Sequence, residues 1–210
     1  MTTRSPDICP FGTDLQKYWN RRHKYFSKFD EGIQIDAEGL YSVTPEEIGA
    51  HQASLIRSTT VLDGFACVGG NAIAFARAGK KVIAVELSSD RIDMAKVNAD
   101  IYGVGNDIDF IEGDFFDVAP TVKASAVYLD PPWGGPSYNE KGVFLLENFE
   151  PDGNKILKLA LELSDEVIIK VPLIFDVSEI DRYSKDYQVY EDITKGRVIS
   201  RTVVIRKPKV

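Results

Sequence analysis

The sequence predicts an α/β protein. Its doubly wound, mostly parallel sheet of seven strands ends in an antiparallel hairpin and follows an N-terminal helical extension. From about residue 59 onward, short runs rich in Val and Ile alternate with helical patterns, which is typical of a parallel sheet covered by helices on both faces. Near the C-terminus, two β-branched runs flank Thr194-Lys195-Gly196, a sequence typical of a hairpin turn. The length of 210 residues fits one such domain with a short extension.

The start of the chain lacks the strand pattern and is predicted to be helical. Asp14 can cap a helix that runs to about Phe29, with its apolar residues along one stripe. In the run from Thr44 to Glu47, the threonine is the expected N-cap of a second helix, the proline its first residue and Glu47 the partner in a capping box. Such a segment is too short to fold alone. We therefore expect residues 1–55 to pack over the ligand-binding edge of a domain spanning residues 56–210.

The elements of the sheet domain follow from local patterns and end signals. Apolar β-branched runs predict strands at residues 59–65, 81–87, 108–112, 124–129, 166–171, 188–193 and 198–205. Helical patterns predict helices at residues 71–78, 89–102, 151–163 and 176–183. Ser88 or Ser89 can cap the second of these helices, and Gly79 and Gly103 can end the first two.

The composition is that of an ordinary globular protein, with 44% hydrophobic and 27% charged residues. The apolar runs are short and interrupted by charges, so we expect no membrane span, and no stretch of signal-peptide length follows the N-terminus. Cys9 and Cys67 are too few for a disulfide framework and lack zinc-site spacing. These features predict an intracellular protein in a reducing compartment.

Basic residues concentrate in two segments, although the net charge of the chain is −7. Residues 17–28 hold five Lys or Arg and residues 195–210 hold six, with no acidic residue in either segment. Such clusters can hold a partner that carries a few phosphates, whereas the acidic remainder would repel a long duplex. The pattern leaves open whether the segments bind a ligand or only form solvated faces.

A glycine-containing loop follows the first predicted strand, in the run Asp63-Gly64-Phe65-Ala66-Cys67-Val68-Gly69-Gly70-Asn71. Its glycines let the backbone approach a ligand at the N-terminus of a helix. The run lacks the G-x-G-x-x-G pattern of dinucleotide sites. It resembles instead the Asp-x-Phe-x-Gly-x-Gly loop with which S-adenosylmethionine (AdoMet)-dependent methyltransferases hold the methionine part of AdoMet. A tight strand-to-helix turn without a ligand is the alternative.

Acidic residues also follow the next two predicted strands. Glu86 lies 23 positions after Asp63, close to the spacing of about 20 expected of a carboxylate that binds ribose hydroxyls. Asp114 follows the third strand and suits an adenine amino group, with Phe115 as an aromatic wall. Three acids at successive strand ends, with a closing antiparallel hairpin, resemble the class I methyltransferases, whereas a nucleotide-binding dehydrogenase is expected to stay parallel. The resemblance implies AdoMet as the cofactor.

The segment Asp130-Pro131-Pro132-Trp133 follows the fourth predicted strand, beside the point where doubly wound sheets bind ligands. Its prolines fix the backbone and leave a carbonyl unpaired. Asp130 and the Pro131 carbonyl can therefore accept both hydrogens of an exocyclic amine, while Trp133 offers a flat face to a base. The segment resembles the Asp/Asn-Pro-Pro-Tyr/Trp motif of enzymes that methylate adenine N6, guanine N2 or glutamine, so Asp130, Pro131 and Trp133 are the predicted catalytic residues. A proline-rich turn with a buried Trp is the structural alternative.

Four runs narrow the resemblance to one family. They are Lys17-Tyr18-Trp19, Phe26-Ser27-Lys28-Phe29-Asp30, Tyr41-Ser42-Val43-Thr44-Pro45-Glu46 and Trp133-Gly134-Gly135-Pro136. Together they resemble the trimethylguanosine synthase family, which methylates N2 of a 7-methylguanosine RNA cap. The resemblance implies a metal-free, monomeric enzyme of the nucleus or the cytoplasm that acts on the cap nucleotide and cap phosphates of RNA.

The resemblance also implies roles for individual residues. The 7-methylguanine cation would stack on Trp133, where attraction between a cation and an indole face is worth about 2 kcal/mol when desolvated. Lys17 and Tyr138 match positions that contact the cap phosphates, and Phe26 matches an aromatic residue of the cofactor or base pocket. The implied cofactor-binding residues are Thr44, Asp63, Gly69, Asn71, Glu86, Asp114 and Phe115.

Two positions depart from the family pattern. Cys67 stands where the family usually has glycine, so the backbone there must avoid positive φ or carry strain. Pro172-Leu173-Ile174 stands where the family has Pro-Arg-Asn, which removes a phosphate-binding arginine at Leu173. Lys170 or a basic residue of the last strands is the expected substitute.

Two other functions are compatible with these residues. One is an amino-methyltransferase that acts on guanine N2 or adenine N6 in uncapped structural RNA. The other is a cap-binding module without catalysis, which the intact Asp130 and Glu86 argue against. The sequence leaves open whether one or two methyl groups are added and which proteins recruit the chain.

Overall fold

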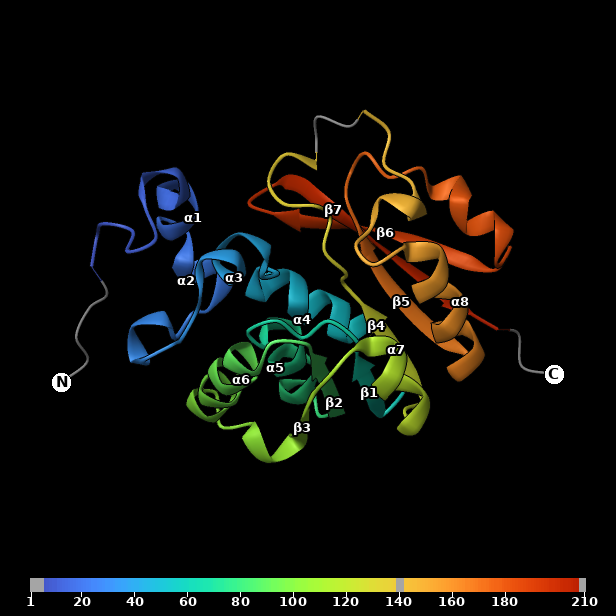
Figure 1. The fold of residues 1–210 in the computed structure, drawn as a ribbon, viewed down its shortest axis with the longest axis horizontal. Helices are drawn as coiled ribbons and strands as arrows, with labels where there is room; N and C mark the ends of the chain where they lie inside the picture. The colour runs from blue at the N-terminus through green and yellow to red at the C-terminus, as the bar shows by residue number, and fades with distance from the viewer. Residues whose placement is uncertain (1–5, 139–141, 208–210) are drawn as a thin grey trace.

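The computed structural model describes residues 6–138 and 142–207, which form a seven-stranded sheet with helices on both faces (Figure 1). The strands are β1 Thr60–Asp63, β2 Lys81–Glu86, β3 Ile108–Glu112, β4 Ala126–Leu129, β5 Glu166–Val171, β6 Tyr187–Thr194 and β7 Arg197–Arg206. The predicted α/β class, the seven strands and the closing hairpin are confirmed.

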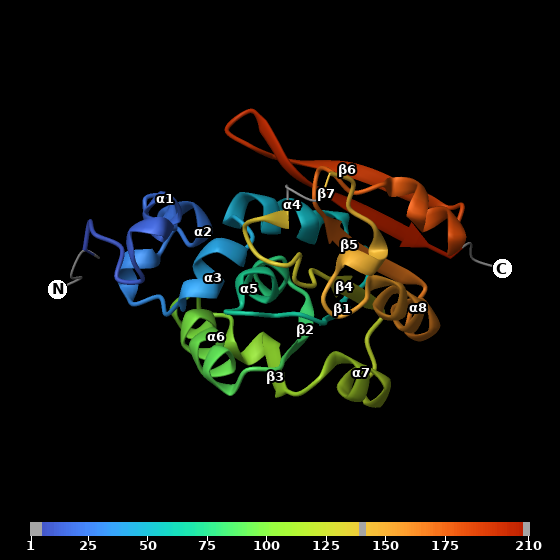
Figure 2. The same ribbon diagram turned by 45° about the horizontal axis from the view of Figure 1, so that its top comes forward.

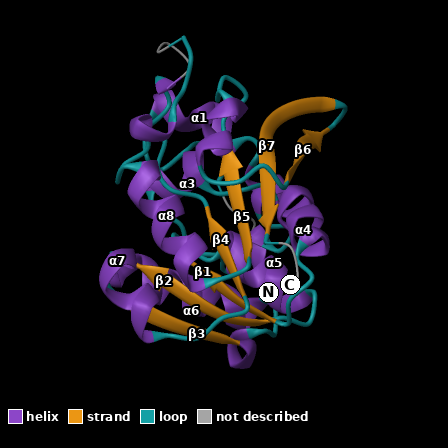
Figure 3. Cartoon of the chain, turned by 90° about the vertical axis from the view of Figure 1, so that its right-hand side faces the viewer, coloured by secondary structure: helices purple, strands orange, loops and turns teal. Residues whose placement is uncertain are grey.

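The strand order is β3-β2-β1-β4-β5-β7-β6. β1 pairs in parallel with β2 and β4, whereas β7 runs antiparallel between β5 and β6 (Figure 3). Lys195 and Gly196 turn the chain between β6 and β7, and their φ angles of 49° and 72° are those of a tight two-residue hairpin turn. Because strand order reverses around β1 and β4, the carboxyl ends of these strands meet at the edge where doubly wound sheets bind ligands.

Alternate residues of each strand enter two apolar clusters on opposite faces of the sheet. In β4, for example, Tyr128 belongs to the cluster covered by α4 to α6, and Leu129 belongs to the cluster covered by α7 and α8 (Figure 2). These helices are α4 Glu46–Leu55, α5 Gly70–Arg77, α6 Ser89–Ile101, α7 Phe115–Val118 and α8 Gly153–Leu163. Short 3₁₀ helices complete the sheet domain, at η3 Gly105–Asp107, η4 Ala119–Thr121, η6 Leu146–Asn148 and η7 Val177–Arg182.

The N-terminal segment consists of short helical turns, so the continuous helix predicted from Asp14 to Phe29 is wrong. The turns are η1 Thr13–Leu15, α1 Gln16–Trp19, α2 Arg22–Tyr25, η2 Phe29–Glu31 and α3 Ala37–Ser42. Asp14 lies inside η1 and caps nothing, and the backbone leaves the helix at Phe26, whose φ of −138° is extended. The break lets Trp19 and Phe29 meet edge to face, with ring centres 5.4 Å apart. Tertiary packing of aromatic side chains thus prevails over helix propensity.

The predictions about the other helices had different outcomes. α4 is present, but Pro45 precedes it and no side chain caps it, so the predicted capping box is wrong. The Thr44 hydroxyl donates instead to Asp130 Oδ2 at 3.1 Å. Ser88 caps α6 as predicted, because its Oγ accepts from the Arg91 amide. The segment predicted as a helix at residues 176–183 is the 3₁₀ helix η7.

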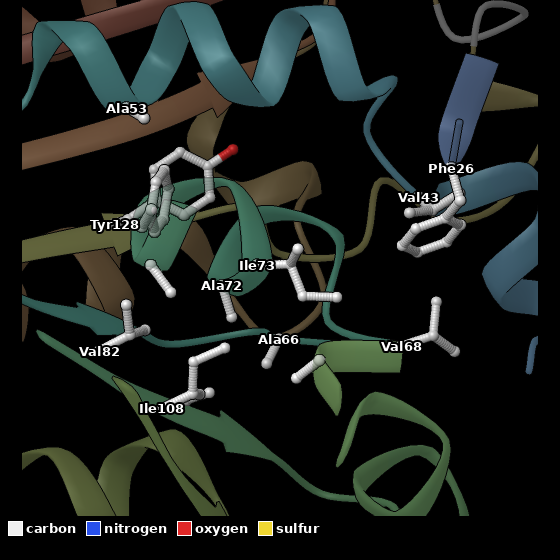
Figure 4. Close-up of a cluster of buried hydrophobic side chains, with 14 of the residues drawn as sticks. Phe26, Val43, Ala53, Ala66, Val68, Ala72, Ile73, Val82, Ile108 and Tyr128 are labelled. Carbon is white, nitrogen blue, oxygen red and sulfur yellow. The ribbon is translucent and has the colours of Figure 1, made fainter. Parts of the chain in front are cut away.

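The N-terminal segment shares its core with the sheet domain. Phe26, Val43 and Val68 lie together at one side of the cluster shown in Figure 4, and Tyr128 of β4 lies at the other. Phe26 is only 2% exposed. This burial fixes the N-terminal segment against the sheet domain. None of the helices in the described parts of the chain combines the length and apolar character that crossing a membrane requires.

Candidate active site

A cavity of about 620 Å³ opens at the carboxyl ends of the parallel strands. The residues that follow β1, β2, β3 and β4 line one side of it, and Lys170 of β5 lies among them. Residues of the N-terminal segment, including Lys17, Tyr18 and Tyr41, line the other side. The cavity is therefore bounded both by the sheet edge and by the segment that packs over it.

The cavity brings together ten of the thirteen residues predicted for the site. They are Lys17, Thr44, Asn71, Glu86, Asp114, Phe115, Asp130, Pro131, Trp133 and Tyr138. Asp63 and Gly69 are buried and do not line the cavity, although residues 64–67 between them do. Phe26 lies in the core and does not line the cavity, so its position gives no support to a contact with a ligand.

The loop between β1 and α5 holds a left-handed backbone at two positions. Gly69 has a φ of 89°, and a Cβ added there would lie 3.1 Å from the Cβ of Ala95. Glycine is therefore required at this close approach of loop and α6. Cys67 has a φ of 50°, in a region that costs a residue with a side chain about 1–2 kcal/mol. Of the two outcomes expected for Cys67, the structure shows the strained one, because its φ is positive.

Glu86 links this loop to the start of α6. Its Oε2 accepts from the Cys67 amide at 2.9 Å and its Oε1 accepts from the Ser88 amide at 3.0 Å. Arg91, which also lines the cavity, approaches Glu86 to 4.0 Å and forms hydrogen-bonded ion pairs with Asp36 and Glu38. Arg91 was not predicted from the sequence, because an arginine on the first turn of a helix gives no sign that it joins two distant acids.

Asp63 is a buried carboxyl group with one unsatisfied oxygen. Its Oδ2 has no hydrogen-bond partner among the described residues, while the Phe65 amide donates to Oδ1 at 3.4 Å. Burial, assisted by the negative charges of Asp130 and Glu86, raises the pKa of Asp63 to about 8. A cation bound near Asp63 would favour the ionised form of this carboxyl and lower its pKa.

Asp130 is held by two side chains that come from distant parts of the chain. Its Oδ2 accepts from Thr44 Oγ1 at 3.1 Å and from Lys170 Nζ at 2.9 Å. Lys170 also donates to Thr44 Oγ1 at 2.9 Å, so the three groups form a closed triangle. No described side chain or backbone group bonds to Asp130 Oδ1. The carboxylate thus has a fixed orientation and a second oxygen that can accept from a ligand.

Trp133 lies between Lys170 and Tyr138. Lys170 Nζ is 5.0 Å from the centre of the Trp133 ring, and Tyr138 meets the ring edge to face at 5.0 Å. The buried Trp133 Nε1 has no hydrogen-bond partner in the described residues. The indole is therefore held in place while still lining the cavity, and its orphaned N–H is a donor that a ligand can satisfy.

Lys170 and the basic residues of the last strands were the expected substitutes for the family's phosphate-binding arginine. The structure distinguishes between them. Lys170 is buried and paired with Asp130, so its charge is already engaged and its position gives no support to a contact with a phosphate. Leu173 is 38% exposed and lies outside the cavity lining. Of the basic residues in the last strands, Arg206 pairs with Glu166 and Lys207 pairs with Asp165. Lys195 lies at the hairpin tip next to Thr194, which lines the cavity, whereas Arg197 and Arg201 of β7 are not part of the lining.

A buried polar network lies behind the cavity wall at Asn71. Asn71 Nδ2 donates to Gln52 Oε1 at 2.7 Å, and Gln52 Nε2 donates to Thr202 Oγ1 at 2.9 Å. Thr202 and Ser200 both donate to Asp192, which is completely buried. Burial raises the pKa of Asp192. The network joins α4, α5 and the closing hairpin, and it was not predicted from the sequence because its members are far apart in the chain.

The comparisons with known proteins agree with this geometry. A model of the family described as RNA cap guanine-N2 methyltransferase matches residues 58–203. The chain is 39% identical over 188 residues to a trimethylguanosine synthase of Schizosaccharomyces pombe, covering 84% of this chain and 78% of that protein. It is 35% identical over 184 residues to a trimethylguanosine synthase of Saccharomyces cerevisiae, covering 81% of this chain and 58% of that protein.

A solved structure supports the fold. The structure of a proposed methyltransferase from Porphyromonas gingivalis matches 100% of this chain and 54% of its own, with a TM-score of 0.75. The two sequences are 18% identical, so this likeness concerns the arrangement of the sheet and helices alone. Among the described residues, no group of three His, Cys, Asp or Glu side chains is placed to hold a metal ion.

Proposed function

Because the chain belongs to the RNA cap guanine-N2 methyltransferase family, we propose that it transfers a methyl group from AdoMet to the exocyclic N2 of 7-methylguanosine in an RNA cap. The observation that carries the proposal is Lys170, which holds Asp130 and lies against Trp133 within one cavity. This arrangement supports the proposal, because Asp130 would accept from an amine and Trp133 would offer an aromatic face to the base. The chain aligns with 58% of the S. cerevisiae relative, so the activity and partners of a whole protein are part of the proposal.

The acidic end of the cavity fits AdoMet. Glu86 would accept from the ribose hydroxyls, and Asp114 would accept from the adenine amino group beside Phe115. The ammonium and sulfonium groups of AdoMet would favour the ionised form of the buried Asp63, whose Oδ2 has no partner among the described residues. Thr44, together with Gly69 and Asn71 at the end of the β1–α5 loop, completes the proposed set of AdoMet-binding residues. When bound, AdoMet supplies an electrophilic methyl group.

Asp130 and Pro131 would orient the amine that is methylated. Asp130 Oδ1 and the Pro131 carbonyl accept its two hydrogens, which directs the nitrogen lone pair toward the methyl donor. Lys170 and Thr44 hold the carboxylate in that orientation. Positioning of this kind can supply several kcal/mol of the barrier reduction. The proton leaves to water or to Asp130, since an alkylated, cationic amine releases it readily.

Trp133 would select a base that carries a positive charge. Methylation at N7 makes guanine cationic, and a cation over a desolvated indole gains about 2 kcal/mol. Lys17 and Tyr138, which line the same cavity, would contact the phosphates that follow the base. We propose that residues 1–55 act as the cover of this site, and that the chain works without a metal, as a monomer, inside the cell, where capped RNA is found.

The direct test compares two RNAs of identical sequence, one with a 7-methylguanosine cap and one with a 5′-hydroxyl end. Each is incubated with the protein and AdoMet, digested to nucleosides and analysed by mass spectrometry. The proposal expects N2-methylated 7-methylguanosine from the capped RNA only, and the mass distinguishes one added methyl group from two. Methylation of internal guanine or adenine in the uncapped RNA would favour the structural-RNA alternative. Binding of capped RNA without any methylation would favour the non-catalytic module.

A further inference from the structure

Two basic segments that are distant in the sequence meet at the mouth of the active-site cavity. Lys17, Arg21 and Lys24 of the N-terminal segment line the cavity. Lys195 lies at the tip of the β6–β7 hairpin, next to Thr194, which lines the cavity as well. We call Lys17, Arg21, Lys24 and Lys195 the basic rim. The fold thus joins the two acid-free segments of the sequence at one place.

A second hollow, of about 560 Å³, adjoins the basic rim. It shares Lys24, Pro45 and Thr194 with the active-site cavity, and Lys195 and Arg77 line it further. We call this hollow the outer groove. A chain-like ligand that leaves the active site can therefore pass over Lys24 and Lys195 while it remains in contact with the protein.

The four side chains of the basic rim form no ion pairs within the described part of the chain. No carboxylate in the described residues lies within ion-pair distance of the rim side chains. The outer groove also contains two carboxylates. Glu46 is engaged by Arg77 and by the Ser27 amide, whereas Glu47 accepts, among the described residues, only from the neutral Thr194 hydroxyl and keeps its negative charge near Lys24. Desolvation, followed by the charges of Lys195 and Arg21, lowers the pKa of Lys24, and the negative charge of Glu47 opposes this shift only in part. The positive charges of the basic rim repel one another, and binding of a polyanion would relieve this repulsion.

We propose that the basic rim binds the phosphodiester backbone of the RNA that follows the cap and guides it into the outer groove. This inference rests on the proposed function, because it takes the cap nucleotide to lie at Trp133. Contacts to phosphates carry no sequence information. The rim would therefore strengthen the binding of any capped RNA without selecting its sequence, and its cations would compensate for the leucine at position 173, which cannot bind a phosphate.

The test separates the cap from the RNA that follows it. The substrates are 7-methyl-GDP and a capped single-stranded RNA, measured with the full chain. The variant is Lys24→Gln combined with Lys195→Asn, since asparagine tolerates the left-handed backbone at residue 195. The matched control is Lys158→Gln, an exposed lysine of α8 that lines neither hollow. Thermal melting establishes that all proteins are folded.

The proposal expects the double variant to raise KM for capped RNA about tenfold and to leave KM for 7-methyl-GDP within about twofold. The slope of log KM for capped RNA against log salt should fall by about 0.7 for each phosphate that the variant no longer neutralises. An unchanged KM for capped RNA, or equal rises for both substrates, would overturn the proposal. So would an acidic peptide that competes as well as uncapped RNA of equal charge, because the rim would then be a general anion surface.

A binding measurement keeps this inference distinct from the proposed function. Fluorescence anisotropy with labelled, uncapped single-stranded RNA reports the rim without methylation. If the wild-type chain methylates no cap but binds this RNA more tightly than the double variant does, the rim stands and the proposed function fails. If the double variant and the wild type bind the RNA equally, the rim fails whatever the enzyme methylates.

Discussion

The ammonium group of Lys170 lies 2.9 Å from Asp130 Oδ2, and both side chains are largely buried, with exposures of 7% and 15%. The two residues come from neighbouring parallel strands, Lys170 from β5 and Asp130 from the end of β4. An ion pair so little exposed is sensitive to the loss of either member, because the remaining charge is left without a partner. A substitution in the Lys170–Asp130 pair should therefore change both the free energy of unfolding and the rate of methyl transfer.

Replacing Lys170 by methionine should lower both stability and turnover. We expect a loss of about 3 kcal/mol in the free energy of unfolding, near the lower end for a broken buried pair, and a fall in kcat of at least tenfold with a smaller change in KM for the cap. Combining Lys170→Met with Asp130→Asn should recover much of the stability but not the turnover. Lys81→Met, which breaks the exposed pair with Asp107, is the control and should alter neither quantity appreciably. Wild-type kcat in Lys170→Met would contradict the positioning role.

Trp133→Ala should abolish cap methylation while leaving AdoMet affinity within a few-fold. The indole supplies the face for the base, whereas the proposed AdoMet contacts come from Glu86, Asp114 and the loop after β1. Turnover of 7-methyl-GDP and calorimetric titration with AdoMet measure the two effects separately. Turnover at the wild-type rate in the variant would mean that Trp133 only packs against Tyr138 and Lys170.

Glu86→Ala should weaken AdoMet binding by about 1–3 kcal/mol, the range for removing hydrogen bonds to a charged acceptor. Glu112 is the matched control, since it pairs in register with Glu86 on the neighbouring strand but is exposed and lies outside the cavity lining. Isothermal titration calorimetry should show a weaker Kd for Glu86→Ala and an unchanged Kd for Glu112→Ala. Equal affinities for both variants would remove Glu86 from the site.

Asp63 should make the stability of the ligand-free protein depend on pH. Its pKa is raised to about 8, mainly by burial, whereas a carboxyl in the unfolded chain ionises near pH 4. The protonated group favours the folded state, and this contribution is lost as the pH rises from about 4 through 8. Asp63→Asn cannot ionise, so its Tm relative to wild type should increase between pH 5 and pH 8.5. A difference in Tm that stays constant over this range would contradict the assignment.

The sequence predicted the features that depend on neighbouring residues. The runs rich in Val and Ile form the strands of the sheet. The acidic residues that follow these strands lie near one another because parallel strands have their carboxyl ends at one edge of the sheet. Asp130 and Trp133 were found through a short contiguous motif. These are local signals whose spatial consequence is fixed by the topology.

Features that depend on distant residues could not be predicted in the same way. The helix expected from Asp14 breaks so that Trp19 can pack on Phe29, and Thr44 bonds to Asp130 instead of capping α4. Lys170 lies on a buried strand, where a lysine is costly without a partner, and its partner is 40 residues away. The lysine that interrupts the apolar run at residues 167–171 was the signal in the sequence that pointed to such a pair.

The most direct test of the central claim is the rate at which the wild-type protein methylates 7-methyl-GDP compared with GDP, read by mass spectrometry under identical AdoMet concentrations. Both nucleotides offer the same N2 amine and the same phosphates, and they differ in the charge presented to Trp133. The loss of about 2 kcal/mol of cation–π attraction corresponds to roughly a 30-fold preference. We predict that 7-methyl-GDP is methylated at N2 and that GDP reacts at least this much more slowly. Equal rates with the two nucleotides would contradict the assignment of this cavity to the methylated cap.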